Sequence, residues 1–283
     1  MAQEVTFERF TTPEHEAATI ALKELALKLN RASVLIILSA KTKTNPYELN
    51  QYRVVASHVL SATSTLSSII TLTEQLSLQV KEALALARIF YETCLVGCFC
   101  AIDEGERANR AELNSIYKTF RKQTQVKDIG SFTFKVSKSY RLDRKDPRVK
   151  EALDMFGGSS SSLRPCFTES REEMTKLISC EDTQAGILFT GIEAMTFDVS
   201  SEIIHGSYHG FELFERIHNG IKSRRENIVE HYNTVFFTIC LSISALAIII
   251  NGKLVPSKYF ESLESEALKP LHPYAEGLLS GRS

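Results

Sequence analysis

The chain has 283 residues, of which 43% are hydrophobic and 24% charged, with a formal net charge of −1. This balance excludes an intrinsically disordered chain, and the near-neutral total gives no global field that would favour nucleic acid or a membrane surface. The six cysteines include no CxxC pair, which argues against a zinc site or a disulfide framework. The first ten residues lack the basic and apolar regions of a secretory signal, so we expect a single cytoplasmic domain over residues 1–283.

The first half of the chain is dominated by helical periodicity. Apolar residues at spacings of three and four predict a long helix over about 13–40, and Asn45-Pro46 begins a second. Residues 80–102 are apolar on most of their circumference, which predicts a central helix. A more polar helix follows, so the N-terminal helices cover about 13–125.

A basic insert covers about 107–150, where 13 Lys/Arg face four Asp/Glu. Residues 132–140 alternate in polarity, which predicts a small β-hairpin arm near 130–142. The charge fits either a solvated face or a contact surface for RNA or phosphate.

The second half also predicts helices. A Gly/Ser loop at 157–162 joins the halves, and C-terminal helices cover about 168–250, the first capped by Thr168, before a tail at 251–283. Residues 234–250 are uncharged but shorter than the roughly 20 residues of a membrane span, which favours a buried helix over a membrane anchor. We therefore predict an all-α bundle of long amphipathic helices around a central apolar helix.

A polar cluster is predicted inside this bundle. Arg88 and Glu92 lie at i, i+4 in the apolar helix, and such charges are buried only when paired. Ser201 and His205 lie one turn apart before a glycine, where the histidine is placed to donate to the Glu92 carboxylate. The cluster either forms a pocket or only fixes helix register.

A second pair, Arg225 and His231, lies near the start of the last helix. Metal-independent ribonucleases of helical-bundle type pair an arginine that stabilises the pentavalent phosphate with a histidine that moves the ribose 2′-hydroxyl proton. These two residues are our candidate catalytic groups, with a solvated helix face as the alternative. His205 and His209 have the spacing of a metal pair, but Gly206 interrupts the helix between them, so we expect neither a metal nor a cofactor.

Residues 87–92 (Ala-Arg-Ile-Phe-Tyr-Glu) and Ser201-x-x-x-His205-Gly206-Ser207 resemble the paired signatures of an uncharacterised bacterial family, domain of unknown function 5677. The similarity covers about residues 45–250. That family is distantly similar to the HEPN superfamily of prokaryotic toxins and phage-defence proteins, and this resemblance implies an all-α bundle.

Two hypotheses follow. The first is a phage-defence or toxin-type effector that cleaves RNA through Arg225 and His231. The second is a non-enzymatic interaction or oligomerisation module, with a homodimer or a partner protein, in which the polar cluster is structural. A membrane-seated effector is a third and less favoured reading.

Overall fold

The computed structural model describes residues 13–74, 79–137, 141–157, 165–197 and 224–272, and every structural statement below concerns these residues. Most of the Gly/Ser loop, Ser201 and His205 lie outside them. The elements in chain order are α1 (Pro13–Ala40), α2 (Pro46–Thr73), α3 (Val80–Ala101), α4 (Glu106–Arg121), β1 (Thr124–Ile129), β2 (Phe132–Ser137), α5 (Pro147–Phe156), α6 (Arg171–Glu181), α7 (Thr183–Ile192), the π-helix η1 (Glu193–Phe197), α10 (Arg224–Lys253), α11 (Lys258–Leu268) and the 3-10 turn η2 (Lys269–Leu271). The all-α prediction is confirmed.

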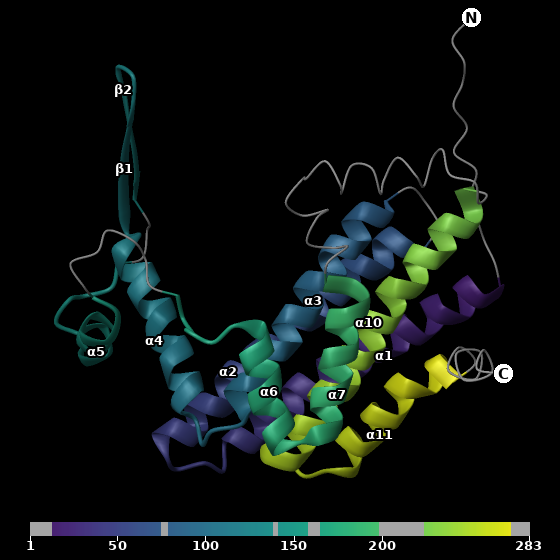
Figure 1. Cartoon of the computed structure of the whole chain (residues 1–283). Helices are drawn as coiled ribbons and strands as arrows, with labels where there is room; N and C mark the ends of the chain where they lie inside the picture. Colours follow the sequence, from purple (N-terminus) through teal and green to yellow (C-terminus); the bar gives the residue numbers. More distant parts are fainter. Residues whose placement is uncertain (1–12, 75–78, 138–140, 158–164, 198–223, 273–283) are drawn as a thin grey trace, which may run out of the picture.

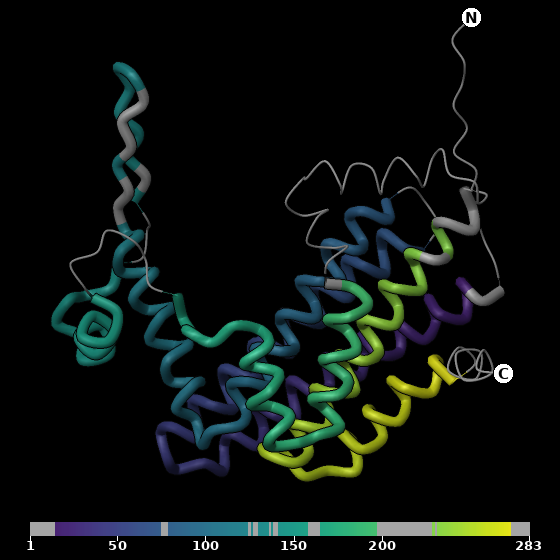
Figure 2. Tube along the Cα trace, in the orientation of Figure 1, coloured from purple at the N-terminus to yellow at the C-terminus, as the bar shows by residue number. Residues whose placement is uncertain are grey.

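The body of the molecule is a bundle in which α2 lies between α1 and α3, and α10 packs on the other side of α3 (Figure 1). Leu22, Leu29 and Ile36 of α1 are fully buried because their spacing of seven keeps them on the face toward the bundle. The helices α7 and α11 cover α10, as the trace in Figure 2 also shows. The expected tail at 251–283 therefore includes a packed helix, α11.

The central helix is α3, as predicted. Its buried residues form one stripe through Phe90 and Tyr91, and the helix is buried on all sides only over its last residues, 97–101. By length and composition alone, three helices in the described part of the chain are apolar enough to cross a membrane: Pro46–Thr73, Val80–Ala101 and His231–Lys253. In the last of these, 72% of the apolar window is buried inside the protein, so neighbouring helices cover most of it.

Helix starts follow local capping chemistry. Asn45 Oδ1 accepts from the Tyr47 backbone N–H at 2.9 Å, which starts α2 where the sequence predicts it. The predicted cap at Thr168 is wrong, because Ser170 caps α6 in a reciprocal box with Glu173. The helix expected from 182 onward changes to π geometry at Glu193.

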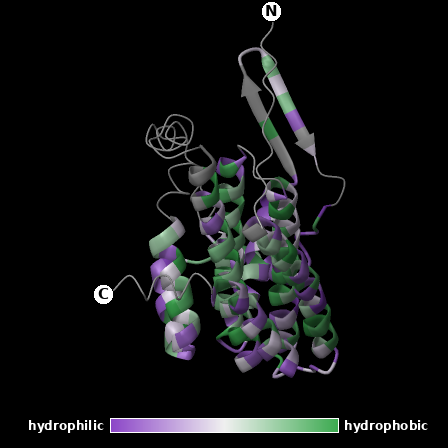
Figure 3. Ribbon diagram, turned by 90° about the vertical axis from the view of Figure 1, so that its right-hand side faces the viewer, coloured by the Kyte–Doolittle hydropathy of each residue, from purple (hydrophilic) through white to green (hydrophobic). Residues whose placement is uncertain are grey.

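The hairpin stands apart from the bundle. Helix α4 leads away from the end of α3, and β1 and β2 continue from it as a projecting two-stranded antiparallel arm (Figures 1 and 3). The register pairs Ile129 with Phe132, so the turn is Gly130-Ser131, and Gly130 takes the positive φ of +61° that this tight turn requires. The predicted hairpin is present, but it covers 124–137 rather than 130–142.

Helix α5 packs against α4 beside the base of the hairpin (Figure 1). Leu113 and Tyr117 of α4 and Ala152 and Phe156 of α5 form a small core separate from that of the bundle. We call residues 106–157 the arm, because this core lets α4, the hairpin and α5 hold their shape outside the bundle.

Candidate functional site

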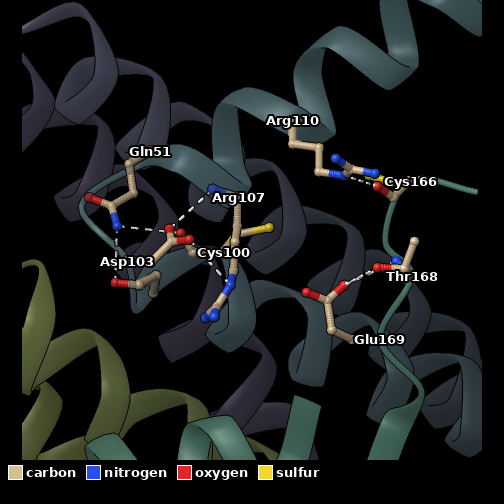
Figure 4. A network of polar contacts seen from close by, with 9 residues as sticks. Gln51, Cys100, Asp103, Arg107, Arg110, Cys166, Thr168 and Glu169 are labelled. Atoms are coloured by element: carbon tan, nitrogen blue, oxygen red, sulfur yellow. Dashed lines mark hydrogen bonds and ion pairs between the residues drawn. The ribbon is translucent and has the colours of Figure 1, made fainter. Parts of the chain in front are cut away.

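The arm joins the bundle through a turn between α3 and α4, drawn in Figure 4. The last carbonyl groups of an α-helix have no backbone N–H partner within the helix. At the end of α3, the side-chain amide of Gln51 in α2 supplies a partner by donating to the Ala101 carbonyl at 3.0 Å. Asp103 accepts from the Arg107 backbone N–H at 3.1 Å and pairs with its guanidinium at 3.2 Å. Gly105 has a φ of +97°, and a Cβ there would lie 2.7 Å from the Tyr47 carbonyl oxygen, so this turn needs glycine.

Two arginines of α4 extend this junction. The Arg107 guanidinium lies 4.0 Å from the centroid of the Phe99 ring, and that ring meets Phe167 edge-on at 5.2 Å. Arg110 donates through Nε to the Cys166 carbonyl at 2.6 Å, which ties α4 to the segment before α6 (Figure 4). Burial raises the pKa of the Cys166 thiol to about 11, so this cysteine is a protonated neighbour of the arginine at neutral pH.

A third arginine, Arg148, fastens α5 to α4. Its guanidinium donates to Asn109 at 2.8 Å and to Glu151 at 2.7 Å, and it also pairs with Glu112. Three of the 13 basic residues of the insert are therefore engaged in structural contacts: Arg107, Arg110 and Arg148.

Most of the other basic residues of the insert face solvent. The described part of the chain shows seven exposed ones, none of which forms an ion pair there: Arg121, Lys122, Lys135, Arg141, Arg144, Lys145 and Lys150. The acidic groups nearby are already engaged, since Asp143 and Asp146 accept from backbone N–H groups and Glu112 binds Arg148. With 13 Lys/Arg against seven Asp/Glu over residues 106–157, the arm has a net positive charge.

Two aromatic rings lie on the same part of the molecule. Phe132 and Phe134 are two residues apart in β2, so they share one face of the hairpin, and they are 70% and 56% exposed. Two strands alone cannot bury such rings. Positive charge and open aromatic faces therefore occur together on the arm.

The predicted polar cluster is described only in its first half. Arg88 Nε donates to Glu92 Oε1 at 2.9 Å, with 11% of the Arg88 side chain and 39% of the Glu92 side chain exposed. The pair lies where α3 reaches the surface rather than deep in the bundle. Because Ser201 and His205 lie outside the described residues, the four-residue cluster stays a prediction.

A neighbouring polar contact was missed by the sequence reasoning. The Tyr91 hydroxyl, on a nearly fully buried ring, donates to Glu193 Oε1, and Arg171 Nε approaches the same oxygen at 3.2 Å. Burial, followed by the Glu193 carboxylate, raises the pKa of Tyr91, so its hydroxyl is a fixed donor. This contact joins α3, α6 and the first residue of η1, and π-turns of this kind occur often at functional sites. A tyrosine within an apolar helix was the only sequence signal.

Arg225 and His231 both lie on α10, in one continuous helix. Six residues on an α-helix span a rotation of about 600°, so the two positions point about 120° apart around the axis. The His231 side chain is partly exposed, while that of Arg225 is outside the described side chains. Their catalytic pairing stays a prediction.

The described residues contain no group of three or more His, Cys, Asp or Glu arranged to hold a metal ion. Burial raises the pKa of the thiols of Cys94, Cys98 and Cys240 far above neutrality, so these cysteines behave as apolar core residues.

These features define a helical-bundle protein with a basic β-hairpin arm. The chain belongs to the family of unknown function DUF5677, whose model matches residues 52–221, from α2 through the arm to beyond η1. No curated protein and no solved structure gives a significant match to the chain. The resemblance to the HEPN superfamily stays a prediction.

Proposed function

We propose that this protein binds single-stranded RNA along the arm. The single observation that carries the proposal is the separation of charge along the chain. The arm, residues 106–157, holds 13 Lys/Arg and seven Asp/Glu, a formal charge of +6, whereas the rest of the chain holds 20 Lys/Arg and 27 Asp/Glu, a charge of −7. A polyanion is therefore attracted to the arm and repelled by the body.

The exposed rings favour a single strand over a duplex. Bases in a single strand have open π-faces that stack on aromatic side chains, whereas bases in a duplex are already stacked on each other. Phe132 and Phe134 offer such faces on one side of β2, and Lys135 lies on the other side of the same strand. In this proposal the seven exposed basic residues follow the RNA backbone and the two rings hold bases.

A labelled single-stranded RNA of about 20 nucleotides tests this by fluorescence anisotropy. The variant Phe132→Leu, Phe134→Leu keeps apolar bulk but removes both rings, and we expect about tenfold weaker binding or more, because stacking contributes roughly 1–3 kcal/mol per base. A duplex RNA of equal length is the matched control, and its affinity should not change. Equal loss on both RNAs would argue against stacking, and no binding by the unmodified protein at low salt would end the proposal.

We infer cleavage of the bound RNA as a second function, favoured by the partly exposed His231 in the first turns of α10. His231 takes the 2′-hydroxyl proton, the 2′-oxygen attacks phosphorus, and the bond to the 5′-oxygen breaks to leave a 2′,3′-cyclic phosphate. The protonated His231 returns that proton to the departing 5′-oxygen, either directly or through solvent. Arg225 stabilises the charge on the pentavalent phosphate. No metal takes part in this scheme.

Such an activity would act in cells as a toxin-type or phage-defence effector. RNA degradation and growth arrest on expression are compared for the unmodified protein and the His231→Ala and Arg225→Lys variants, with chelator present. Loss of both readouts in His231→Ala, with RNA binding retained, supports cleavage. Equal degradation by all three proteins would remove the assignment and leave RNA binding intact.

A further inference from the structure

A row of apolar side chains lies on the outer face of α1. Ile20, Leu27 and Val34 follow each other at intervals of seven, and they are 59%, 63% and 49% exposed. Leu38 and Ile37 are also exposed at the end of the row. This face points away from the bundle, because the buried residues of α1, such as Leu22 and Leu29, lie on the opposite side of the helix.

The row has the repeat of a helix that pairs with another helix. Residues seven apart on an α-helix are only about 20° apart around the axis, so Ile20, Leu27 and Val34 form a nearly straight apolar line. Single exposed leucines are common on protein surfaces, but a continuous line of them marks an interaction site.

Charged and polar side chains flank this apolar line on both sides, and they restrict which surface can pack against it. Glu24 and Arg31 are also seven apart, so both lie on the same flank of the line, and both are exposed. Neither forms an ion pair within the described residues. Lys23 and Asn30 lie on the other flank, where Lys23 pairs with Glu74 of α2 at 2.8 Å.

We propose that the outer face of α1 binds a second copy of itself, in an antiparallel pair with a two-fold axis at Leu27. Ile20 and Val34 are each seven residues from Leu27, so Ile20 of one protomer lies level with Val34 of the other, and Leu27 meets its own copy. The apolar line is therefore complementary to itself under this symmetry.

The flanking charges fit the same axis. In an antiparallel two-fold pair each flank faces its own copy, so Glu24 faces Arg31 of the other protomer, and this occurs twice. Glu24 is three residues before the axis and Arg31 four after it, a mismatch of one residue, or about 1.5 Å. The other flank places Lys23 opposite Asn30, with no like charges in contact. A parallel pair would instead face Glu24 with Lys23 and leave Arg31 opposite Asn30.

Charge reversal in the full-length chain tests both the interface and its direction. The Glu24→Arg and Arg31→Glu variants each turn two attractive pairs into two repulsive ones, and each should raise the dimer dissociation constant about tenfold. Mixed in equal amounts, the two variants restore both attractive pairs in a heterodimer, so dimerisation should return. The variant Lys176→Glu on the exposed face of α6 is the control and should dimerise normally.

Sedimentation equilibrium of each protein and of the mixture gives the result. A wild-type chain that stays monomeric up to about 100 μM would overturn the proposal, because a dissociation constant above that concentration is weaker than that of most specific associations. Single variants that weaken the dimer without recovery on mixing would overturn the antiparallel arrangement. All these substitutions lie on exposed positions outside the arm, so RNA binding reports separately on the proposed function.

Discussion

The arm offers the most direct quantitative prediction. Arg141, Arg144 and Lys145 lie together between the hairpin and α5, and all three are exposed. Replacing each with glutamine removes three positive charges without touching the small core of the arm. The acidic neighbours Asp143 and Asp146 keep their backbone contacts, because they accept from the N–H groups of residues 145 and 148.

The expected magnitude follows from counterion release. Each phosphate neutralised on a single strand contributes about 0.7 to the slope of log K against log salt, which corresponds to about fourfold in affinity at 0.15 M salt. If all seven exposed basic residues contact phosphate, the slope for the unmodified protein is about −5, and the triple variant reduces it to about −3. Its affinity at 0.15 M salt should fall about fiftyfold.

Anisotropy titrations of labelled single-stranded RNA at several salt concentrations measure both quantities. The matched control is Arg53→Gln, Lys81→Gln, Lys258→Gln, which removes three exposed charges from the bundle and should leave the slope unchanged. Far-UV circular dichroism and thermal unfolding verify the fold of both variants. A similar loss in the two variants would mean that the net charge, and not the arm, drives binding, and this would refute the reasoning.

Three predictions concern stability and use denaturant unfolding. Tyr91→Phe removes the donor to Glu193 and should lower the free energy of unfolding by about 2 kcal/mol, whereas Tyr47→Phe at an exposed position should change it little. Gly105→Ala forces a side chain into a positive φ against the Tyr47 carbonyl and should cost about 2 kcal/mol or more, while Gly191→Ala, with open space around it, should be neutral or stabilising. Burial lowers the pKa of His15 and His58 below the unfolded value of 6.5, so the unfolded chain takes up protons first as the pH falls. The free energy of unfolding should therefore decrease from pH 7.5 to 5.5, and a flat profile would contradict the buried neutral state of these histidines.

The long helices could be predicted because their signals are local. The spacing of Leu22, Leu29 and Ile36 and the cap at Asn45 act within a few turns of the chain. As a result α1 and α3 begin and end, and α2 begins, close to the expected residues. Helix α5 was missed, although Asp146-Pro147 is a start signal and Val149, Ala152 and Phe156 have helical spacing. A helix of only ten residues is marginally stable by itself, and α5 is stabilised by its packing against α4. That packing could not be predicted from the local sequence.

Among the polar contacts, those between near neighbours in the chain could be predicted and those between distant residues could not. Arg88 and Glu92 meet because they are four residues apart on one helix, which the sequence alone predicts. Tyr91 and Glu193 are 102 residues apart, and the sequence around either residue does not predict the other as its partner. The same holds for Arg110 and the Cys166 carbonyl, 56 residues away.

For this protein, residue order alone determined the helical class, the central apolar helix, the basic insert and the pairing of Arg88 with Glu92, because hydrophobic period, capping and charge act between near neighbours. Tertiary packing decided that the basic insert leaves the bundle as an arm, that α11 packs on the bundle, and that none of the described residues covers the outer face of α1. These outcomes depend on which surfaces remain after the core is filled, and that is a property of the whole chain.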